Sequence, residues 1–149
     1  MALFLVAGCS GTGAADSPQT TTRHCDLAPL LERRAGLDPT DCGHAPVPDD
    51  VGKVDACVVA AFQAGRAFVA EYARVGTDSE VTAGIAGDAT GVVTFLLRDG
   101  DPSGGSMTGA VAWASICSTP SVDLSPTRDP LRDPPLSCAS TVSSNKICE

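Results

Sequence analysis

The longest regular pattern of apolar and polar residues along this chain has the period of an α-helix. It starts at the pair Asp49 and Asp50 and stops at Gly76, a residue type that commonly ends helices. Within it, apolar residues recur at intervals of three and four positions. The apolar side consists of Val51, Val54, Cys57, Val58, Ala61, Phe62, Gly65, Phe68, Val69 and Tyr72. The pattern predicts one helix of about six turns.

Beyond Gly76 the apolar residues alternate with smaller or polar ones, which is the period of a β-strand. Three such segments are separated by turn-forming residues at positions 87–91 and 99–106. Their apolar residues on one face are Val81, Ala83 and Ile85, then Val93, Phe95 and Leu97, then Val111 and Trp113. The pattern predicts three antiparallel strands joined by hairpins.

The predicted helix and sheet match in size, because three strands about 4.8 Å apart form a sheet that one helix about 10 Å across can cover. We therefore expect the apolar side of the helix to pack on one face of the sheet. The expected core consists of Val54, Val58, Phe62, Phe68, Val69 and Tyr72 from the helix and Val81, Ile85, Val93, Phe95, Leu97, Val111 and Trp113 from the sheet. The other face carries small, only partly polar residues, and a further segment can cover it.

The two ends of the chain show less regular patterns. Asp26 is placed to cap a short helix whose apolar face is Leu27, Leu30 and Leu31, and Gly36 is placed to end it. Residues 118–149 are rich in proline and have little periodicity, so we expect a tail that lies across the domain.

Together these patterns predict an α+β fold with one long helix on a three- to four-stranded antiparallel sheet and irregular, disulfide-linked terminal segments. A single domain is expected over residues 23–149, of which residues 118–149 form the tail. Residues 1–8 match the end of a signal peptide, and residues 9–22 contain only small and polar residue types typical of a flexible tether.

Seven cysteines in 149 residues, with no Cys-x-x-Cys pair, indicate an oxidising compartment rather than a zinc or redox site. Setting Cys9 aside leaves an even set of six, which can pair in 15 ways. We expect Cys42–Cys57 to tie the approach loop to the helix, and Cys117–Cys138 to fold the tail onto the third strand. Cys25–Cys148 then follows by exclusion, and a Cys138–Cys148 bridge is the main alternative.

The N-terminal residues Val6-Ala7-Gly8-Cys9 resemble the bacterial lipobox, in which small residues precede a cysteine that is lipidated and becomes the mature N-terminus. The resemblance implies a lipoprotein anchored in the membrane by acyl chains such as palmitate on Cys9. Ser10 at the next position, rather than Asp, implies the outer membrane of a Gram-negative cell. No Lys or Arg precedes the short apolar run, which fits a start upstream of Met1. The alternative is a buried or paired Cys9.

The net charge of −8 places an acidic surface on the domain, which phosphate backbones and anionic headgroups would repel. We therefore expect no nucleic-acid partner. The expected partners are the membrane, through the lipid, and an envelope protein.

Residues for catalysis are sparse. The only histidines are His24 and His44, and no nucleophile elbow or metalloprotease helix is present. A zinc site from both histidines with Cys25 and Cys42 competes with oxidation of those cysteines, and oxidation is favoured. An envelope enzyme would have to use the acidic residues Asp78, Glu80, Asp99 and Asp101. We expect no catalytic residues and no cofactor.

The loop from Asp99 to Gly105 matches the opening of a calcium loop through Asp99, Asp101 and Ser103. The match fails at its twelfth position, where Ala110 replaces the bidentate Glu. We expect an exposed hairpin connection there, with a calcium-stabilised module as the alternative.

The order of a long helix, a Gly-Thr-Asp-Ser turn at residues 76–79, two hairpins and flanking cysteines resembles small secreted lipoproteins of myxobacteria. The resemblance covers roughly residues 42–138 and brings no catalytic residues. It implies a helix-on-sheet domain of the cystatin-like kind, in which the sheet serves as a binding platform. The resulting prediction is a non-catalytic binding or structural lipoprotein of the cell envelope that uses its sheet face or hairpin tips.

Overall fold

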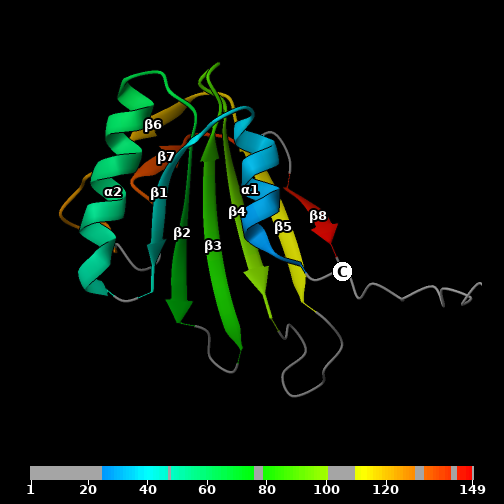
Figure 1. Cartoon of the computed structure of the whole chain (residues 1–149). Helices are drawn as coiled ribbons and strands as arrows, with labels where there is room; N and C mark the ends of the chain where they lie inside the picture. Colours follow the sequence, from blue (N-terminus) through cyan, green and yellow to red (C-terminus); the bar gives the residue numbers. More distant parts are fainter. Residues whose placement is uncertain are drawn as a thin grey trace, which may run out of the picture.

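A computed structural model describes residues 25–46, 48–75, 79–100, 110–129, 133–141 and 144–148. The elements, in chain order, are α1 (Leu27–Ala35), β1 (Thr40–Ala45), α2 (Pro48–Gln63), β2 (Phe68–Val75), β3 (Glu80–Gly87), β4 (Val93–Asp99), β5 (Val111–Cys117), β6 (Pro120–Val122), β7 (Leu136–Cys138) and β8 (Ser144–Cys148). Figure 1 shows them as one layer of strands with helices packed against it.

The main sheet has six strands in the order β1-β2-β3-β4-β5-β8, and β6 pairs with β7 in a small second sheet. β1 runs parallel to β2, while the other neighbours in the main sheet are antiparallel. The predicted α+β class is confirmed, as are the three strands β3, β4 and β5. The sheet is larger than expected and mixed, because β1, β2 and β8 arise from segments expected to be loop, helix and tail.

The expected six-turn helix is wrong in its second half, because α2 ends at Gln63. Gly65 has a φ of 63°, and the Arg66 amide donates to the Ala61 carbonyl at 3.0 Å, which closes the helix end. Phe68 and Tyr72 are four positions apart, a spacing that puts two residues on one side of a helix and also on one face of a strand. The β-branched and aromatic residues of this segment favour the strand.

One face of the sheet packs on α2. Val54 and Val58 from the helix are buried with Phe68 and Tyr72, which belong to β2 rather than to the helix, and with Ile85 from β3. The expected core is therefore largely present but divided between different elements. Val69 is an exception, because side chains of neighbouring residues in a strand point to opposite faces and Val69 packs in the core on the other side of the sheet.

The opposite face packs on α1 (Figure 1), which contacts β2, β3 and β4. As predicted, the Asp26 side chain accepts a hydrogen bond from the Ala28 amide at 3.3 Å and Gly36 ends the helix with a φ of 91°. Leu31 is buried directly over Gly84, where an added Cβ would lie 2.9 Å from the leucine methyl carbons. The absence of a side chain on β3 thus lets α1 approach the sheet.

Three disulfides join Cys42 to Cys57, Cys117 to Cys138 and Cys25 to Cys148. They are the same three pairs that the cysteine spacing predicts. The first fastens β1 to α2, the second fastens β7 to the end of β5, and the third links the start of α1 to β8.

The tail is more ordered than its composition predicts. Leu136 of β7 is buried in the core beneath α2, and β6 pairs with β7 at 120–122. The part of the tail that includes β6 and β7 therefore lies on the α2 face as a small two-stranded sheet, whereas β8 extends the main sheet beside β5.

Candidate binding cavity on the sheet

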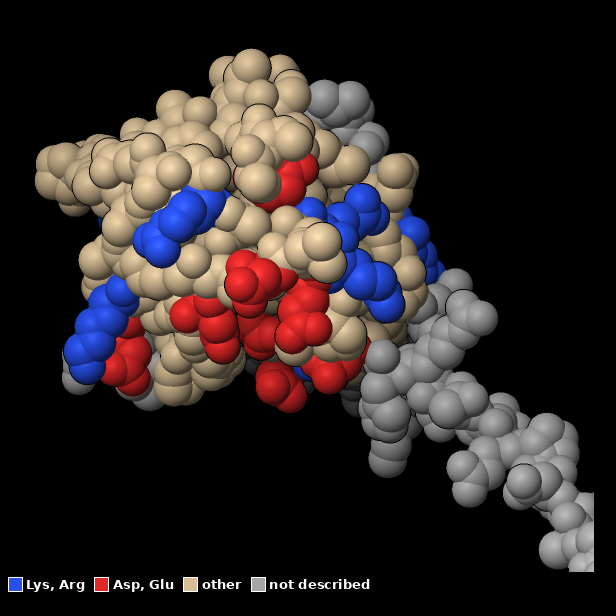
Figure 2. Space-filling model, turned by 45° about the horizontal axis from the view of Figure 1, so that its top comes forward, with Lys and Arg blue, Asp and Glu red and all other residues tan. Residues whose placement is uncertain are grey.

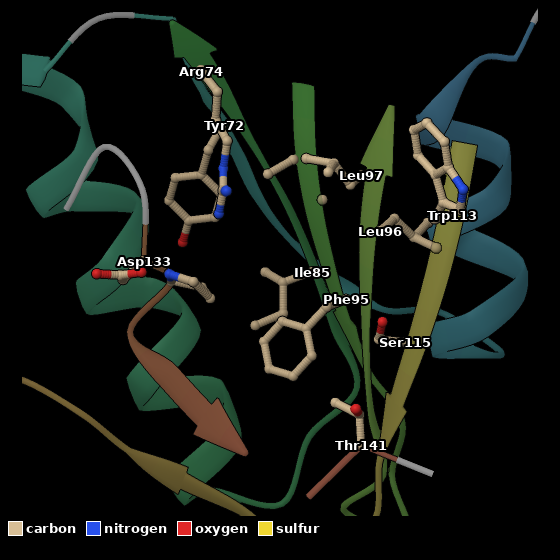
Figure 3. A pocket seen from close by; sticks show the side chains of 13 residues that line it. Tyr72, Arg74, Ile85, Phe95, Leu96, Leu97, Trp113, Ser115, Asp133 and Thr141 are labelled. Carbon is tan, nitrogen blue, oxygen red and sulfur yellow. The ribbon is translucent and has the colours of Figure 1, made fainter. Parts of the chain in front are cut away.

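α2 covers only part of its sheet face. The helix contacts β1 and β2 extensively, and the part of the same face over β4 and β5 extends beyond it. There Phe95 and Trp113 are half-buried, and Leu97 is 37% exposed. A cavity of about 490 Å³ lies over these residues, and Figure 3 shows their side chains on its floor.

The register of the strands builds this floor. Ala83, Leu97 and Trp113 lie directly opposite one another on β3, β4 and β5, and Ile85, Phe95 and Ser115 form the next row. Side chains in such rows contact their neighbours across the sheet. Each row has one small residue, Ala83 at one end of the first and Ser115 at the other end of the second, and the cavity lies over both rows.

β2 supplies the polar end of the cavity. Tyr72 and Arg74 are two positions apart in β2, so both lie on the cavity face. Figure 3 shows the Arg74 guanidinium beside the Tyr72 ring, across the cavity from Trp113. The Nε atom of Arg74 is buried and has no hydrogen-bond partner among the described residues. Burial lowers the pKa of Arg74, while the charges of Asp133 and Asp129 act to raise it. An arginine in such a setting remains a cation at neutral pH.

A buried network fixes the wall on the tail side. The Tyr72 hydroxyl donates a hydrogen bond to Asp55 Oδ1 at 3.1 Å, and the other carboxylate oxygen of Asp55 forms an ion pair with Arg128. Arg128 also donates to the backbone carbonyl of Asp133 at 2.6 Å. This holds the segment of Asp133 and Pro134 against the cavity. Burial, followed by the charge of Asp55, raises the pKa of Tyr72 well above its ordinary value.

A second cleft, of about 530 Å³, lies between α1 and β1 on the opposite face. Its wall is acidic and includes Glu32, Asp41 and Glu71, and Figure 2 shows Asp and Glu side chains gathered near the middle of the view. His44 Nδ1 lies 3.7 Å from Glu71 Oε2. Burial raises the pKa of Glu71; the proximity of His44 opposes this shift, while Asp26 and Asp41 reinforce it.

The acids of the enzyme hypothesis lie elsewhere. His44 pairs in register with Glu71, whereas Glu80 pairs with Val75, four residues further along β2. Asp99 lies beside Glu80, since the amide of the following residue donates to the Glu80 carbonyl at 2.8 Å. Within the described residues, His44 and these acids therefore do not form one site. His24, Asp78 and Asp101 lie outside the described residues.

The structure describes some of the residues that the two metal-site hypotheses require. Cys25 and Cys42 are in disulfides and cannot form the zinc site. No group of three His, Cys, Asp or Glu side chains within the described ranges is arranged to hold a metal ion. Asp99 ends β4, while Asp101 and Ser103 of the calcium hypothesis, like Cys9 of the lipobox, lie outside those ranges.

Trp113 lies on the α2 face of the sheet, as the strand pattern predicts, but it is half-buried at the cavity rather than part of the core. A helix that continued to Gly76 would carry Arg74 on its polar side, away from the sheet, whereas Arg74 lies in β2. Phe68, Ala70, Tyr72 and Arg74 occupy every second position of β2, and this period of two is the sequence feature that places Arg74 on the same face as Phe68 and Tyr72.

No protein-family model matches this chain, and neither curated proteins nor solved structures show significant similarity to it. None of the helices in the described residues is long and apolar enough to cross a membrane.

Proposed function

We propose that this protein is a non-catalytic binding lipoprotein of the cell envelope whose ligand lies in the cavity over β3, β4 and β5. The observation that supports this most strongly is the cavity itself, in which an apolar and aromatic floor ends at a half-buried arginine. Small-molecule sites are typically concave, mainly apolar and equipped with a few polar groups, and their volumes are about 300–1,000 Å³. The cavity has each of these properties.

The anchor belongs to the same proposal. Three disulfides use six of the seven cysteines, and Cys9 is the one that remains. It follows the small residues Ala7 and Gly8, as a lipidated cysteine does. Stable anchoring takes two or more acyl chains. Mass spectrometry of the N-terminus from native membranes is expected to show a diacylglyceryl cysteine, whereas an unmodified chain that retains Met1 would contradict the anchor.

Trp113 is the only tryptophan in the chain and lies on the cavity floor, so its fluorescence reports directly on occupancy. We expect the uncharged apolar probe phenylbutanamide to change this emission in a saturable way. Leu97→Asp introduces a charge on the floor and is expected to weaken the response at least tenfold. The matched control is Leu124→Asp, because Leu124 is 62% exposed and lies outside the cavity. No saturable response to this amide or to its carboxylate counterpart phenylbutanoate, or an equal response in both variants, would contradict binding at this site.

A further inference from the structure

Arg74 is a cationic residue that lines a mainly apolar cavity, which Asp133 also lines. Its guanidinium can donate five hydrogen bonds. The Nε donor is nevertheless buried and has no partner within the described part of the chain. An unpaired buried donor costs free energy, and a ligand that accepts from it would remove that cost.

Arg128 is an arginine of the same fold that has side-chain and backbone partners. It is 9% exposed, forms an ion pair with Asp55 and donates to the carbonyl of Asp133. The fold therefore pairs the arginine that fastens the tail, whereas Arg74 lines the cavity and its buried Nε donor has no partner within the described residues. A ligand in the cavity that Arg74 lines can supply hydrogen-bond acceptors to its guanidinium.

The position of Arg74 relative to the cavity floor defines the shape of a ligand that would contact both. Trp113 on β5 and Tyr72 on β2 belong to one row across the sheet, separated by three strand spacings of about 4.8 Å, or about 14 Å. Arg74 lies beside Tyr72 at the far end (Figure 3). A molecule that fills the cavity thus meets Phe95, Leu97 and Trp113 along its body and a cation at its end.

We infer that the ligand is an apolar monocarboxylate whose carboxylate accepts hydrogen bonds from Arg74 while its apolar body lies on the β3–β5 floor. This inference rests on the proposed function. Carboxylates match the planar fork of a guanidinium and accept charge-assisted hydrogen bonds. Asp133 and Asp129 lie near enough to influence the charge of Arg74, and the whole chain has a net charge of −8. Both features oppose any anion, and they oppose a doubly charged phosphate or phosphonate head more than a single carboxylate.

The test compares phenylbutanoate with its neutral near-isostere phenylbutanamide, using Trp113 fluorescence on the full disulfide-bonded chain. Wild-type protein is expected to bind the carboxylate about tenfold more tightly than the amide. In Arg74→Gln this preference is expected to fall to about one, while Arg74→Lys keeps part of it because the charge remains. Arg66→Gln is the matched control, since Arg66 is exposed in the α2–β2 connection, and it should behave as wild type.

The outcomes separate the two proposals. Equal affinity of wild type for carboxylate and amide, or a preference that survives Arg74→Gln, would overturn the carboxylate assignment and leave cavity binding intact. Tighter binding of the dianion phenylphosphonate than of phenylbutanoate would overturn it as well. Failure of every probe to bind would overturn the proposed function itself. Should Arg74→Gln not fold, the carboxylate-to-amide ratio of wild type and of Arg74→Lys decides.

Discussion

Asp55 connects three separate parts of the chain through one carboxylate. It belongs to α2, accepts from Tyr72 of β2 and pairs with Arg128 of the tail, 73 residues away. On the sequence it falls on the polar side of an amphipathic helix and looks solvent-exposed. Its burial could not be predicted, because the residue that compensates its charge lies in a segment with no regular pattern.

Asp55→Asn is expected to destabilise the fold by about 3 kcal/mol, because it leaves Arg128 buried without its counter-charge. Arg128→Met removes the other charge and should be costly for the same reason. The double variant is expected to lose clearly less than the sum of the two, since neither charge is then buried alone. Urea unfolding of all four proteins measures this, and additive losses would contradict a buried ion pair.

Tyr72 gives the fold a defined response to alkaline pH. Burial and the nearby Asp55 raise its folded-state pKa, whereas in the unfolded chain the value is about 10. A raised folded-state pKa means that the folded protein binds this proton more tightly. The associated stability is therefore fully present below about pH 10 and is lost as the pH rises further.

Tyr72 is the only tyrosine, so ultraviolet absorbance of the phenolate follows it alone. We expect no phenolate in the folded protein near pH 10, and its appearance together with unfolding at higher pH. Tyr72→Phe should lose this tyrosine-linked fall in the free energy of unfolding. Phenolate formation near pH 10 in protein whose circular dichroism remains native would disprove the buried hydrogen bond.

At the scale of elements, the patterns that were predicted correctly are those with local causes. α1 has its own cap and stop in Asp26 and Gly36, and turn-forming residues at 87–91 and 99–106 separate β3, β4 and β5 in the sequence. β2 was missed because Phe68 and Tyr72 satisfy both periods, and only pairing with β3 decides between them. β1 and β8 have only weak alternation of apolar and polar residues, and they form strands through pairing with β2 and β5.

Two glycines of β3 are in close contact with neighbouring side chains, and the contact distances predict which alanine variant is less stable. An added Cβ at Gly87 would lie 2.2 Å from the Phe68 ring, whereas at Gly84 it would lie 2.9 Å from the flexible end of Leu31. Gly87→Ala is therefore expected to cost about 1–3 kcal/mol through overpacking, and Gly84→Ala less. Thermal unfolding of the two variants checks this order, and the reverse order would contradict the packing of β2 on β3.

At the scale of the whole molecule, the disulfides differ in how much of the chain they enclose. Cys25–Cys148 spans 123 residues and Cys42–Cys57 spans 15. On the chain-entropy model, loss of the long bridge costs about 5 kcal/mol and loss of the short one about 3. Unfolding of the two double Cys→Ala variants in urea is expected to show this difference, and a smaller loss for Cys25→Ala with Cys148→Ala would contradict it.

The cavity is also a property of the whole molecule. The sequence indicates that Phe95, Leu97 and Trp113 share a face, but a helix of six turns was expected to cover them. The shorter α2 and the position of the tail leave that part of the sheet open. The site could be predicted only as a sheet platform, because its opening depends on where α2 ends and where Asp55 holds the tail.

Chemical-shift mapping by NMR tests the central claim most directly, because the chain has a single indole N–H resonance, that of Trp113. Addition of phenylbutanoate is expected to shift this resonance in a saturable way, together with backbone amides of β3, β4 and β5 around the cavity. Shifts confined to the acidic cleft near His44 and Glu71, with the indole resonance unchanged, would contradict the assignment of the sheet cavity as the binding site.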